Sequence, residues 1–502
     1  MSDSNANIND TQNTADAAPV FNLKTSAFVF LLALTGCSAY EERNTPDPQE
    51  LGIPAQWQLT VDETGASPKS LFLADKNTQN QLYSPLLATT AQTRWVKNFN
   101  DPSLALLVER VLSSNASLAA EAAKVVSAGA GQIQSESALY PTLDLTGSIS
   151  ESQTGDNRSS SESVKLNAGF ELDIWGKLSA REQEASLNYA AARASFSGAV
   201  LELSADVAEG WYNLITQKKL LKLYKRREDT LINALKVVEQ GYQNGLKEID
   251  ELYSARQSLQ DERDNITSQS QIVTEQIRAL QVFLGRYPDG RLLNEEGLEL
   301  PELPALITGI LPSELITRSP VLQSYWLTLL AADAGLAAAN RERFPSLSLS
   351  ASVDQSIDWN LMASLTQPLF NAGKLAAAED QAAANVEQQE KLYLQTVFAT
   401  FADVENVLMQ EATLAHRYQL ASEDLETARN TTTLALSQYQ LGLTDLDSLL
   451  AVQKSMLDSE AQLLTLHNQR LSNRIRLYQL LGGDTRSEQA FLADKAQPSD
   501  AL

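Results

Sequence analysis

Few residues in this chain could carry catalytic or metal chemistry. The 502 residues include two histidines, His416 and His467, and one cysteine, Cys37. Both histidines fall inside helical patterns, and no phosphate-binding loop is present. A copper or silver carrier would need clustered methionines, but the methionines of this chain are scattered. We therefore expect no catalytic residues, no enzyme activity, no cofactor and no metal site.

Carboxylates gather instead just after two turns that interrupt long helical patterns. Glu248 and Asp250 follow the first turn, and Asp445 and Asp447 follow the second. If several chains met there, each position would form a ring of like charges, which raises carboxylate pKa values and attracts cations. The alternative is that these acids only stabilise helix N-termini through the helix dipole.

Cys37 ends a short apolar segment near the N-terminus. The residues before it, Leu34-Thr35-Gly36, complete a stretch that resembles the lipobox of a bacterial lipoprotein signal, whose cysteine receives a lipid before cleavage. We expect residues 1–36 to be this signal and Cys37 to carry the lipid, including palmitate. The alternative is an idle thiol in a short core helix.

The charge balance excludes some partners. The formal net charge is −24, from 39 basic and 63 acidic residues. Such an excess of acid argues against nucleic acid or an anionic lipid surface as the main partner.

Most of the chain is built from two copies of one unit. An alternating apolar run ends at Trp175-Gly176 and is followed by a long helical pattern, and the same change occurs around Phe370 and Gly373. Gly373 lies 197 residues after Gly176. The same spacing separates Tyr242 from Tyr439, Gly245 from Gly442, Asp250 from Asp447 and Gly285 from Gly482. This constant spacing indicates an internal duplication.

The repeat divides the chain into expected segments. After the signal come an extended arm (37–93), a first repeat (94–285), a connector (286–311), a second repeat (312–483) and a polar tail (484–502). In each repeat we expect a helix, a β-hairpin, a very long helix and a last helix. The first helices are expected at about 102–139 and 312–342, and the hairpin strands at about 142–150, 163–174, 346–353 and 357–367, with a loop over about 151–162.

The hairpin strands are long enough to cross a bilayer when tilted. Aromatic residues stand at their ends, where an interfacial girdle would lie, namely Tyr140, Trp175, Phe344 and Phe370. Open strand edges are too costly in hydrocarbon, and single-chain barrels begin at about eight strands, so several chains would have to share one barrel. The alternative is two ordinary hairpins on a soluble domain.

Together these stretches resemble the TolC-like outer-membrane efflux proteins, in their lipoprotein (NodT- or OprM-like) branch. The resemblance is carried by 95–102, 139–145, 170–177, 367–374 and 439–443. It implies a mainly α fold with membrane β: a homotrimer whose 12-stranded outer-membrane β-barrel continues as a 12-helix periplasmic α-barrel. Trp175, Gly176, Phe370 and Gly373 would then mark the seam between barrel and tunnel.

The resemblance also implies a function. Such a protein is the outer-membrane exit duct of a tripartite efflux system, a passive conduit for drugs or other small molecules. It docks through a periplasmic adaptor to an inner-membrane pump, commonly of the RND type. Relatives often carry a gate aspartate where this chain has Ala451, so the constriction candidates are Asp445, Asp447, Asp250 and Glu248. Two alternatives stay open, the outer-membrane component of type I protein secretion and a periplasmic coiled-coil adaptor.

Overall fold

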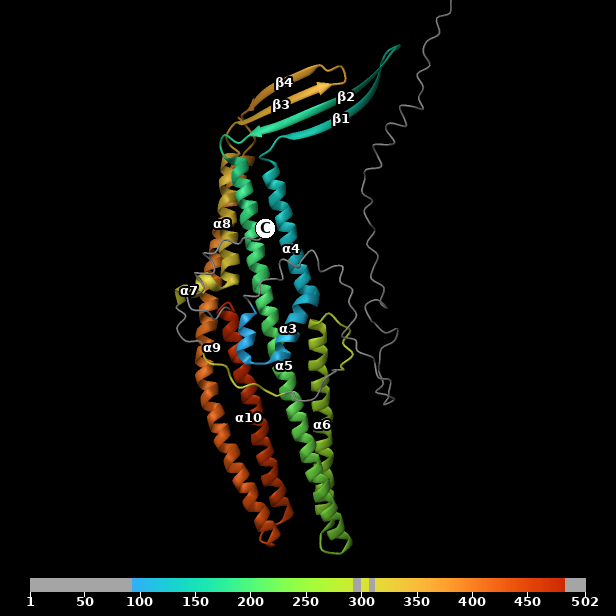
Figure 1. Cartoon of the computed structure of the whole chain (residues 1–502), viewed down its shortest axis with the longest axis vertical. Helices are drawn as coiled ribbons and strands as arrows, with labels where there is room; N and C mark the ends of the chain where they lie inside the picture. Colours follow the sequence, from blue (N-terminus) through green and yellow to red (C-terminus); the bar gives the residue numbers. More distant parts are fainter. Residues whose placement is uncertain (1–92, 292–298, 307–311, 484–502) are drawn as a thin grey trace, which may run out of the picture. The chain divides into compact units, whose positions relative to one another are not determined.

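The computed structural model describes residues 93–291, 299–306 and 312–483 (Figure 1). All described residues belong to one unit within Asp62–Leu502. The expected signal (1–36), Cys37, all but the last residue of the expected arm (37–93) and the tail (484–502) therefore lie outside the described residues.

The two repeats fold into helices of equal length. The first repeat contains α4 (Ala116–Ser137), α5 (Lys177–Gln243) and α6 (Ile249–Phe283), and the second contains α8 (Pro320–Arg341), α9 (Lys374–Gln440) and α10 (Leu446–Leu480). These pairs have 22, 67 and 35 residues each. The bounds of α9 and α10 lie 197 residues after those of α5 and α6, and the bounds of α8 lie 204 after those of α4. The predicted duplication is confirmed.

The predicted single helices over 102–139 and 312–342 are wrong, because each is divided near its start. A 3₁₀ turn η2 (Arg94–Phe99) and α3 (Pro102–Ser114) precede α4, and α7 (Pro312–Arg318) precedes α8. At the first break the Asn115 side chain accepts a hydrogen bond from the Leu118 amide at 2.9 Å. At the second break Ser319 is the capping residue. Both are preferred N-cap residues, so each starts a new helix.

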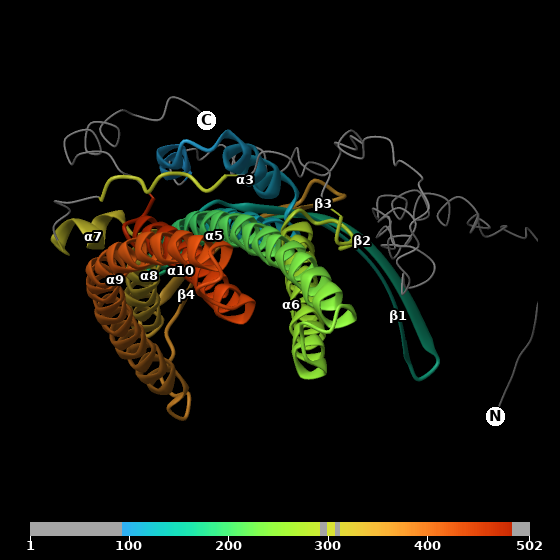
Figure 2. The same cartoon turned by 90° about the horizontal axis from the view of Figure 1, so that it is seen from below.

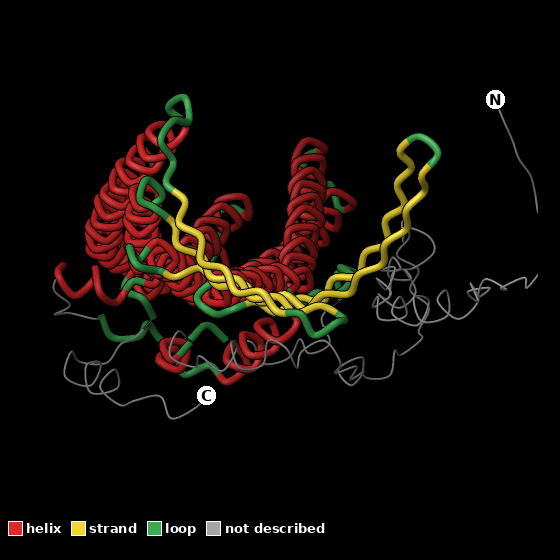
Figure 3. The backbone as a smooth tube through the Cα atoms, turned by 90° about the horizontal axis from the view of Figure 1, so that it is seen from above, coloured by secondary structure: helices red, strands yellow, loops and turns green. Residues whose placement is uncertain are grey.

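The strands in the described part of the chain form one antiparallel sheet in the order β1-β2-β3-β4 (Figure 3). They are β1 (Thr142–Thr154), β2 (Asn157–Leu172), β3 (Ser346–Asp354) and β4 (Trp359–Thr366). The expected loop over 151–162 is wrong, since β1 and β2 continue through most of it. Serine hydroxyls bond across this extension at 2.8–2.9 Å, in the pairs Ser148–Ser163, Ser150–Ser161 and Ser152–Ser159. Among the residues that the structure describes, the outer edges of β1 and β4 are unpaired.

The long helices follow a curved wall, with α3 on its convex side (Figures 2 and 3). An aromatic cluster holds η2 against this wall: Trp95 stacks on Tyr478 at 5.8 Å, and Phe99 lies 5.7 Å from the ring of Tyr212. These four side chains are buried. The convex face of α5 is therefore covered within the chain, while no described element forms such a layer on the concave face.

No helix among the described residues is long and apolar enough to cross a membrane.

Candidate functional site at the two ends of the helices

The first seam, where β2 ends and α5 begins, is tightly bonded. Gly176 caps α5 with φ at +74°, a conformation that glycine adopts without steric cost. Its carbonyl accepts a hydrogen bond from Arg341 at 2.7 Å. The Trp175 indole stacks on Phe344 at 5.4 Å and donates from Nε1 to the Pro345 carbonyl at 2.8 Å. Three of the predicted seam and interface residues therefore meet at this point.

The second seam, between β4 and α9, lacks these bonds. Gly373 caps α9 with φ at +85°, as the repeat predicts. The position equivalent to Trp175 is Ala372, and Phe370 occupies the place of Asp173, whose carboxylate accepts the Leu178 and Ser179 amides at the first seam. Phe370 is 90% exposed, and Tyr140, at the start of β1, is 61% exposed. The second seam thus presents apolar surface where the first is closed by polar contacts.

The opposite ends of the long helices are two equivalent turns. After α5 the Leu246 amide donates to the Gly241 carbonyl at 2.8 Å, and after α9 the Leu443 amide donates to the Gln438 carbonyl at 2.9 Å. Positive φ at Gly245 and Gly442 closes both helices. Just inside the turns one apolar cluster joins the two helix pairs, formed by Ala234, Val238, Leu252, Ala435, Leu446 and Leu449. The two helix pairs are therefore packed together just inside their tips, and the turns themselves form two separate ends (Figure 1).

The predicted acids lie at these tips and fall into different local roles. Asp445 caps α10 and accepts the Ser448 amide at 2.7 Å, while Asp447 lies in the first turn of the same helix. Hydrogen bonds from Ser448 hold the pKa of Asp445 below its usual range. Glu248 stands at the cap position of α6 without a side-chain bond to the helix, and Asp250 follows it in the first turn. Asp445 therefore stabilises the N-terminus of α10.

Lys247 is a tip residue that the sequence patterns missed. Its ammonium pairs with Glu251 on α6, and the pKa of Lys247 is raised by that bond and by the charges of Glu251 and Asp447. The charge of Asp447 on the second tip thus contributes to the raised pKa of Lys247 on the first. The difference between the repeats marks it, because the equivalent residue 197 positions later is Thr444. Ala451, one turn beyond Asp447, is exposed and adds no charge.

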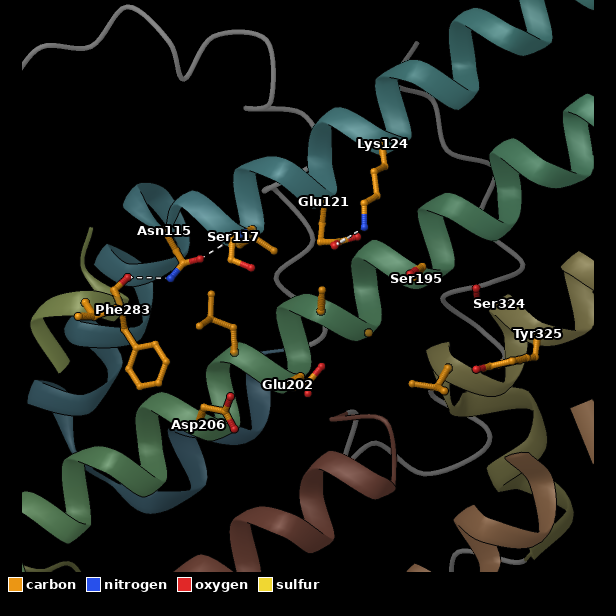
Figure 4. A pocket seen from close by; sticks show the side chains of 16 residues that line it. Asn115, Ser117, Glu121, Lys124, Ser195, Glu202, Asp206, Phe283, Ser324 and Tyr325 are labelled. Atoms are coloured by element: carbon orange, nitrogen blue, oxygen red, sulfur yellow. Dashed lines mark hydrogen bonds and ion pairs between the residues drawn. The ribbon is translucent and has the colours of Figure 1, made fainter. Parts of the chain in front are cut away.

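A groove of about 650 Å³ lies along α5 where α4 and α6 meet end to end (Figure 4). Asn115 joins the two by donating to the Phe283 carbonyl at 2.9 Å. Glu202 and Asp206 of α5 line the groove, and burial together with the Glu202 charge raises the pKa of Asp206. The wall is therefore acidic at this level as well as at the tips.

The two histidines have structural surroundings. The His467 ring bonds to the Pro301 carbonyl at 2.9 Å and lies 5.8 Å from the Tyr418 ring, and His416 is exposed on α9. Within residues 93–291, 299–306 and 312–483 no group of three or more His, Cys, Asp or Glu is placed to hold a metal ion.

The comparisons with known proteins agree with this arrangement. Residues 107–286 and 311–483 match the family described as Outer membrane efflux protein. The cation efflux system protein CusC of Escherichia coli strain CFT073 is 28% identical over 477 residues, covering 91% of this chain and 97% of that protein. The pyoverdine export outer membrane protein OpmQ of Pseudomonas aeruginosa PAO1 is 27% identical over 425 residues, covering 80% and 90%. A crystal structure of CusC superposes with a TM-score of 0.71 at 25% identity, covering 79% of this chain and 96% of that one.

Two hairpins with open outer edges, continued by paired helices of equal length, define a subunit of a membrane channel. The chain belongs to the outer membrane efflux protein family. Its fold is that of these channels, a shared β-barrel continued by a helical barrel, and it is an outer-membrane efflux channel with a large periplasmic extension. The channels of this family are trimers that work with a periplasmic adaptor and an inner-membrane pump, as the resemblance implied.

Proposed function

We propose that three copies of this chain close one passive exit duct, which carries small molecules handed over by an RND-type pump and its adaptor. The observation that carries this proposal is the sheet β1-β2-β3-β4, whose two outer edges have no partner strand in the described part of the chain. Unpaired backbone groups are too costly in a bilayer to stay open, and β4 of one copy offers its edge to β1 of the next.

The concave face of the helical wall would line the duct, because η2 and α3 cover the convex face (Figure 2). The segments 94–285 and 312–483 would act as the two repeats, with 286–311 as the connector between them in the sequence. Cys37 would carry the lipid that holds the N-terminal arm at the outer membrane. CusC is named for cation efflux and OpmQ for pyoverdine export. In our proposal the pump chooses the cargo, and a wide acidic duct selects little.

At the periplasmic end we propose a constriction made by Asp445, Asp447, Asp250 and Glu248, with Lys247 joining neighbouring tips. This arrangement is supported by the pKa of Lys247, which is raised by Glu251 and by Asp447 from the other tip. In a trimer each tip would contribute three times, so the acids would face one another around the axis.

The function is tested in Gram-negative cells that lack their own efflux channels but contain an RND pump and adaptor. Expression of the chain should lower the accumulation of a fluorescent pump substrate to near the level of cells with their native channel. A pump-inactive strain is the matched control and should show no change. If the chain reaches the outer membrane as a trimer and accumulation stays high with every RND pump tried, the proposal is wrong. Export restored only beside an ATPase-driven secretion transporter would favour the protein-secretion alternative.

A further inference from the structure

The two repeats have different neighbours inside the chain. In the tip half, α5 packs between α6 and α10. Its equivalent, α9, packs extensively against α10 on one side only, and α6 packs extensively against α5 alone, among the described residues. One flank of α9 and one flank of α6 are therefore open. Within the chain α10 packs beside α5. Since α6 is the equivalent of α10 and α9 is the equivalent of α5, the repeat predicts that α6 of a second copy packs beside α9.

The repeat holds at the level of single contacts. A Cβ added to Gly285 would lie 2.7 Å from the Ser114 carbonyl oxygen. A Cβ added to Gly482 would lie 2.7 Å from the Arg318 carbonyl oxygen. These pairs are related by the helix spacings, 197 residues for the glycines and 204 for the carbonyls. Contacts in one repeat therefore predict contacts at equivalent positions of the other.

Inside the chain, α5 and α10 are joined by ion pairs. Arg226 pairs with Glu460 at 2.9 Å. The next residue, Arg227, pairs with Asp458 at 3.5 Å and with the fully buried Glu262 of α6 at 2.9 Å. Arg226–Glu460 and Arg227–Asp458 thus link the two helix pairs, while Arg227–Glu262 joins α5 to α6 within one pair.

The equivalent positions on the open flanks carry complementary charge in reversed order. The residue 197 positions after Arg226 is Glu423 on α9, and the residue 197 positions before Glu460 is Arg263 on α6. If the open flanks of α9 and α6 did not contact each other, nothing would favour a reversal of the charge at both positions together. Glu423 is exposed, and the Arg263 side chain is 52% exposed. Arg263 donates to Glu228 of its own chain through Nε at 2.9 Å, and its planar fork suits a second carboxylate.

The neighbouring pair differs. The equivalents of Arg227 and Asp458 are Asp424 and Asp261, which have the same sign. The open flanks thus combine one attractive and one repulsive pair, while the flanks within the chain have two attractive pairs.

We propose that α9 of one copy packs against α6 of the next copy and that Glu423 forms an ion pair there with Arg263 of the next copy. This inference rests on the proposed trimer and specifies the register in which its tip halves meet. The occupant of the open flank is a second copy of this chain, because the charges on the flank match another flank of the same chain. The like-charged Asp424 and Asp261 make the contact between copies weaker than the contact within a copy.

The first experiment is a crosslink between cysteines. The variant Arg263→Cys/Glu423→Cys, treated in membranes with a short bismaleimide, should run as covalent dimers and trimers on a denaturing gel. The matched control Arg226→Cys/Glu460→Cys should react equally but stay a monomer, because that pair lies within one chain. Single-cysteine variants control for Cys37. Reaction of Arg263→Cys/Glu423→Cys within one chain, or no reaction in a protein that is trimeric by mass in detergent, would overturn the register.

The second experiment reverses the charges. Glu423→Arg and Arg263→Glu should each lower the fraction of trimer that survives mild heating, by roughly two- to fivefold, since the worth of an exposed pair is small. The double reversal should restore it. Asp424→Arg should raise it above the wild type, because it recreates opposite Asp261 the pair that Arg227 makes with Asp458.

The outcomes separate this inference from the proposed function. A wild-type chain that never forms trimers contradicts the trimer itself. A stable wild-type trimer that ignores all of these charge changes overturns only the Glu423 contact. Loss of adaptor binding with unchanged trimer stability would assign the flank to the adaptor and also overturn it.

Discussion

Arg474 donates from Nη2 to Oε1 of Glu411 at 2.6 Å, inside the contact between α9 and α10. Both residues are buried, and Arg474 also donates to the Pro304 carbonyl at 2.7 Å, which fastens the connector to the helices. In the first repeat the equivalent positions, 197 residues earlier, are Leu214 and Ile277, and both are buried in the core. The same two interior positions thus hold an ion pair in the second repeat and two aliphatic side chains in the first.

This comparison predicts that the protein tolerates replacement of both members of the Glu411–Arg474 ion pair better than replacement of one member alone. Glu411→Leu alone leaves a buried guanidinium without its carboxylate, and we expect a loss of about 3–5 kcal/mol. Glu411→Leu with Arg474→Ile, which copies the first repeat, should cost less than either single change. Melting of the helical circular dichroism in detergent measures this. The prediction is wrong if the two losses simply add.

Gly482 should tolerate no side chain. Its φ is +83°, and a Cβ would lie 2.7 Å from the Arg318 carbonyl oxygen. We expect Gly482→Ala to cost about 1–3 kcal/mol through strain and collision. Gly442→Ala is the matched control, because its φ is +70° but a Cβ there meets nothing within 4 Å. It should cost roughly 1 kcal/mol. Equal melting temperatures for the two variants would contradict the close approach at Gly482.

The tip acids should control conductance. Replacing Asp445 and Asp447 together by Ala should raise the conductance of single channels in planar bilayers, because two carboxylates of the proposed constriction and the cap of α10 are lost. Lys247→Ala should do the same to a smaller degree, because it removes the ion pair with Glu251 but leaves Asp445 and Asp447 in place. Unchanged conductance in both variants would move the constriction away from the tips.

The pH dependence follows from the lowered pKa of Asp445. A carboxyl whose folded pKa is depressed stabilises the fold above its unfolded value, about 3.9, and this contribution is lost as pH falls through the folded value. Conductance should therefore stay constant from about pH 7 to pH 5 and rise only below about pH 4. Asp445→Asn keeps an N-cap side chain without the charge, so the part of the acid response due to Asp445 should disappear in that variant.

The register of the shared sheet between copies can be stated in the same way. Within the chain Asn167 is paired with Ser352. Their equivalents are Ser364, 197 positions after Asn167, and Ser148, 204 positions before Ser352. A Ser148→Cys/Ser364→Cys variant should form disulfides between chains on oxidation, and Asn167→Cys/Ser352→Cys should form them within one chain. Ile149→Cys with Ser364→Cys should fail, since a shift by one residue points the side chains to opposite faces.

Cys37→Ser should abolish incorporation of labelled palmitate while leaving a trimer that is extracted from membranes more easily. The lipobox interpretation depends on the single cysteine of the chain. Persistent labelling of the variant would show that the lipid is attached at another residue and that the lipobox interpretation is wrong.

Much of the fold could be predicted because its main features repeat. The glycines 197 residues apart mark both turns and both seams, and the proline-free stretches between them became α5 and α9. The breaks at Asn115 and Ser319 were missed because a single capping side chain ends a helix without changing the apolar pattern around it. The strands beyond Ser150 were missed because serine pairs, rather than apolar alternation, hold them together.

The candidate site could be predicted only in part. The acids after the turns and the aromatics at the seams follow from position along the chain. Lys247 could not be recognised in this way. The charge that acts on it from the neighbouring tip belongs to Asp447, which is two hundred residues away in sequence. Likewise the bond from Arg341 to Gly176 joins different repeats, and no local pattern announces it.

The equal lengths of the paired helices restrict how this protein can change over evolution. An insertion in α5 alone would push one tip past the other, separate Leu252 from Leu446, and move Lys247 away from Asp447. The same insertion would have to appear in α6, α9 and α10 to keep the tips level. Length changes in the long helices should therefore survive only as matched sets. The β1–β2 hairpin is free to vary in length. It is already seven residues longer than its counterpart, which is the difference between the 204 and 197 spacings.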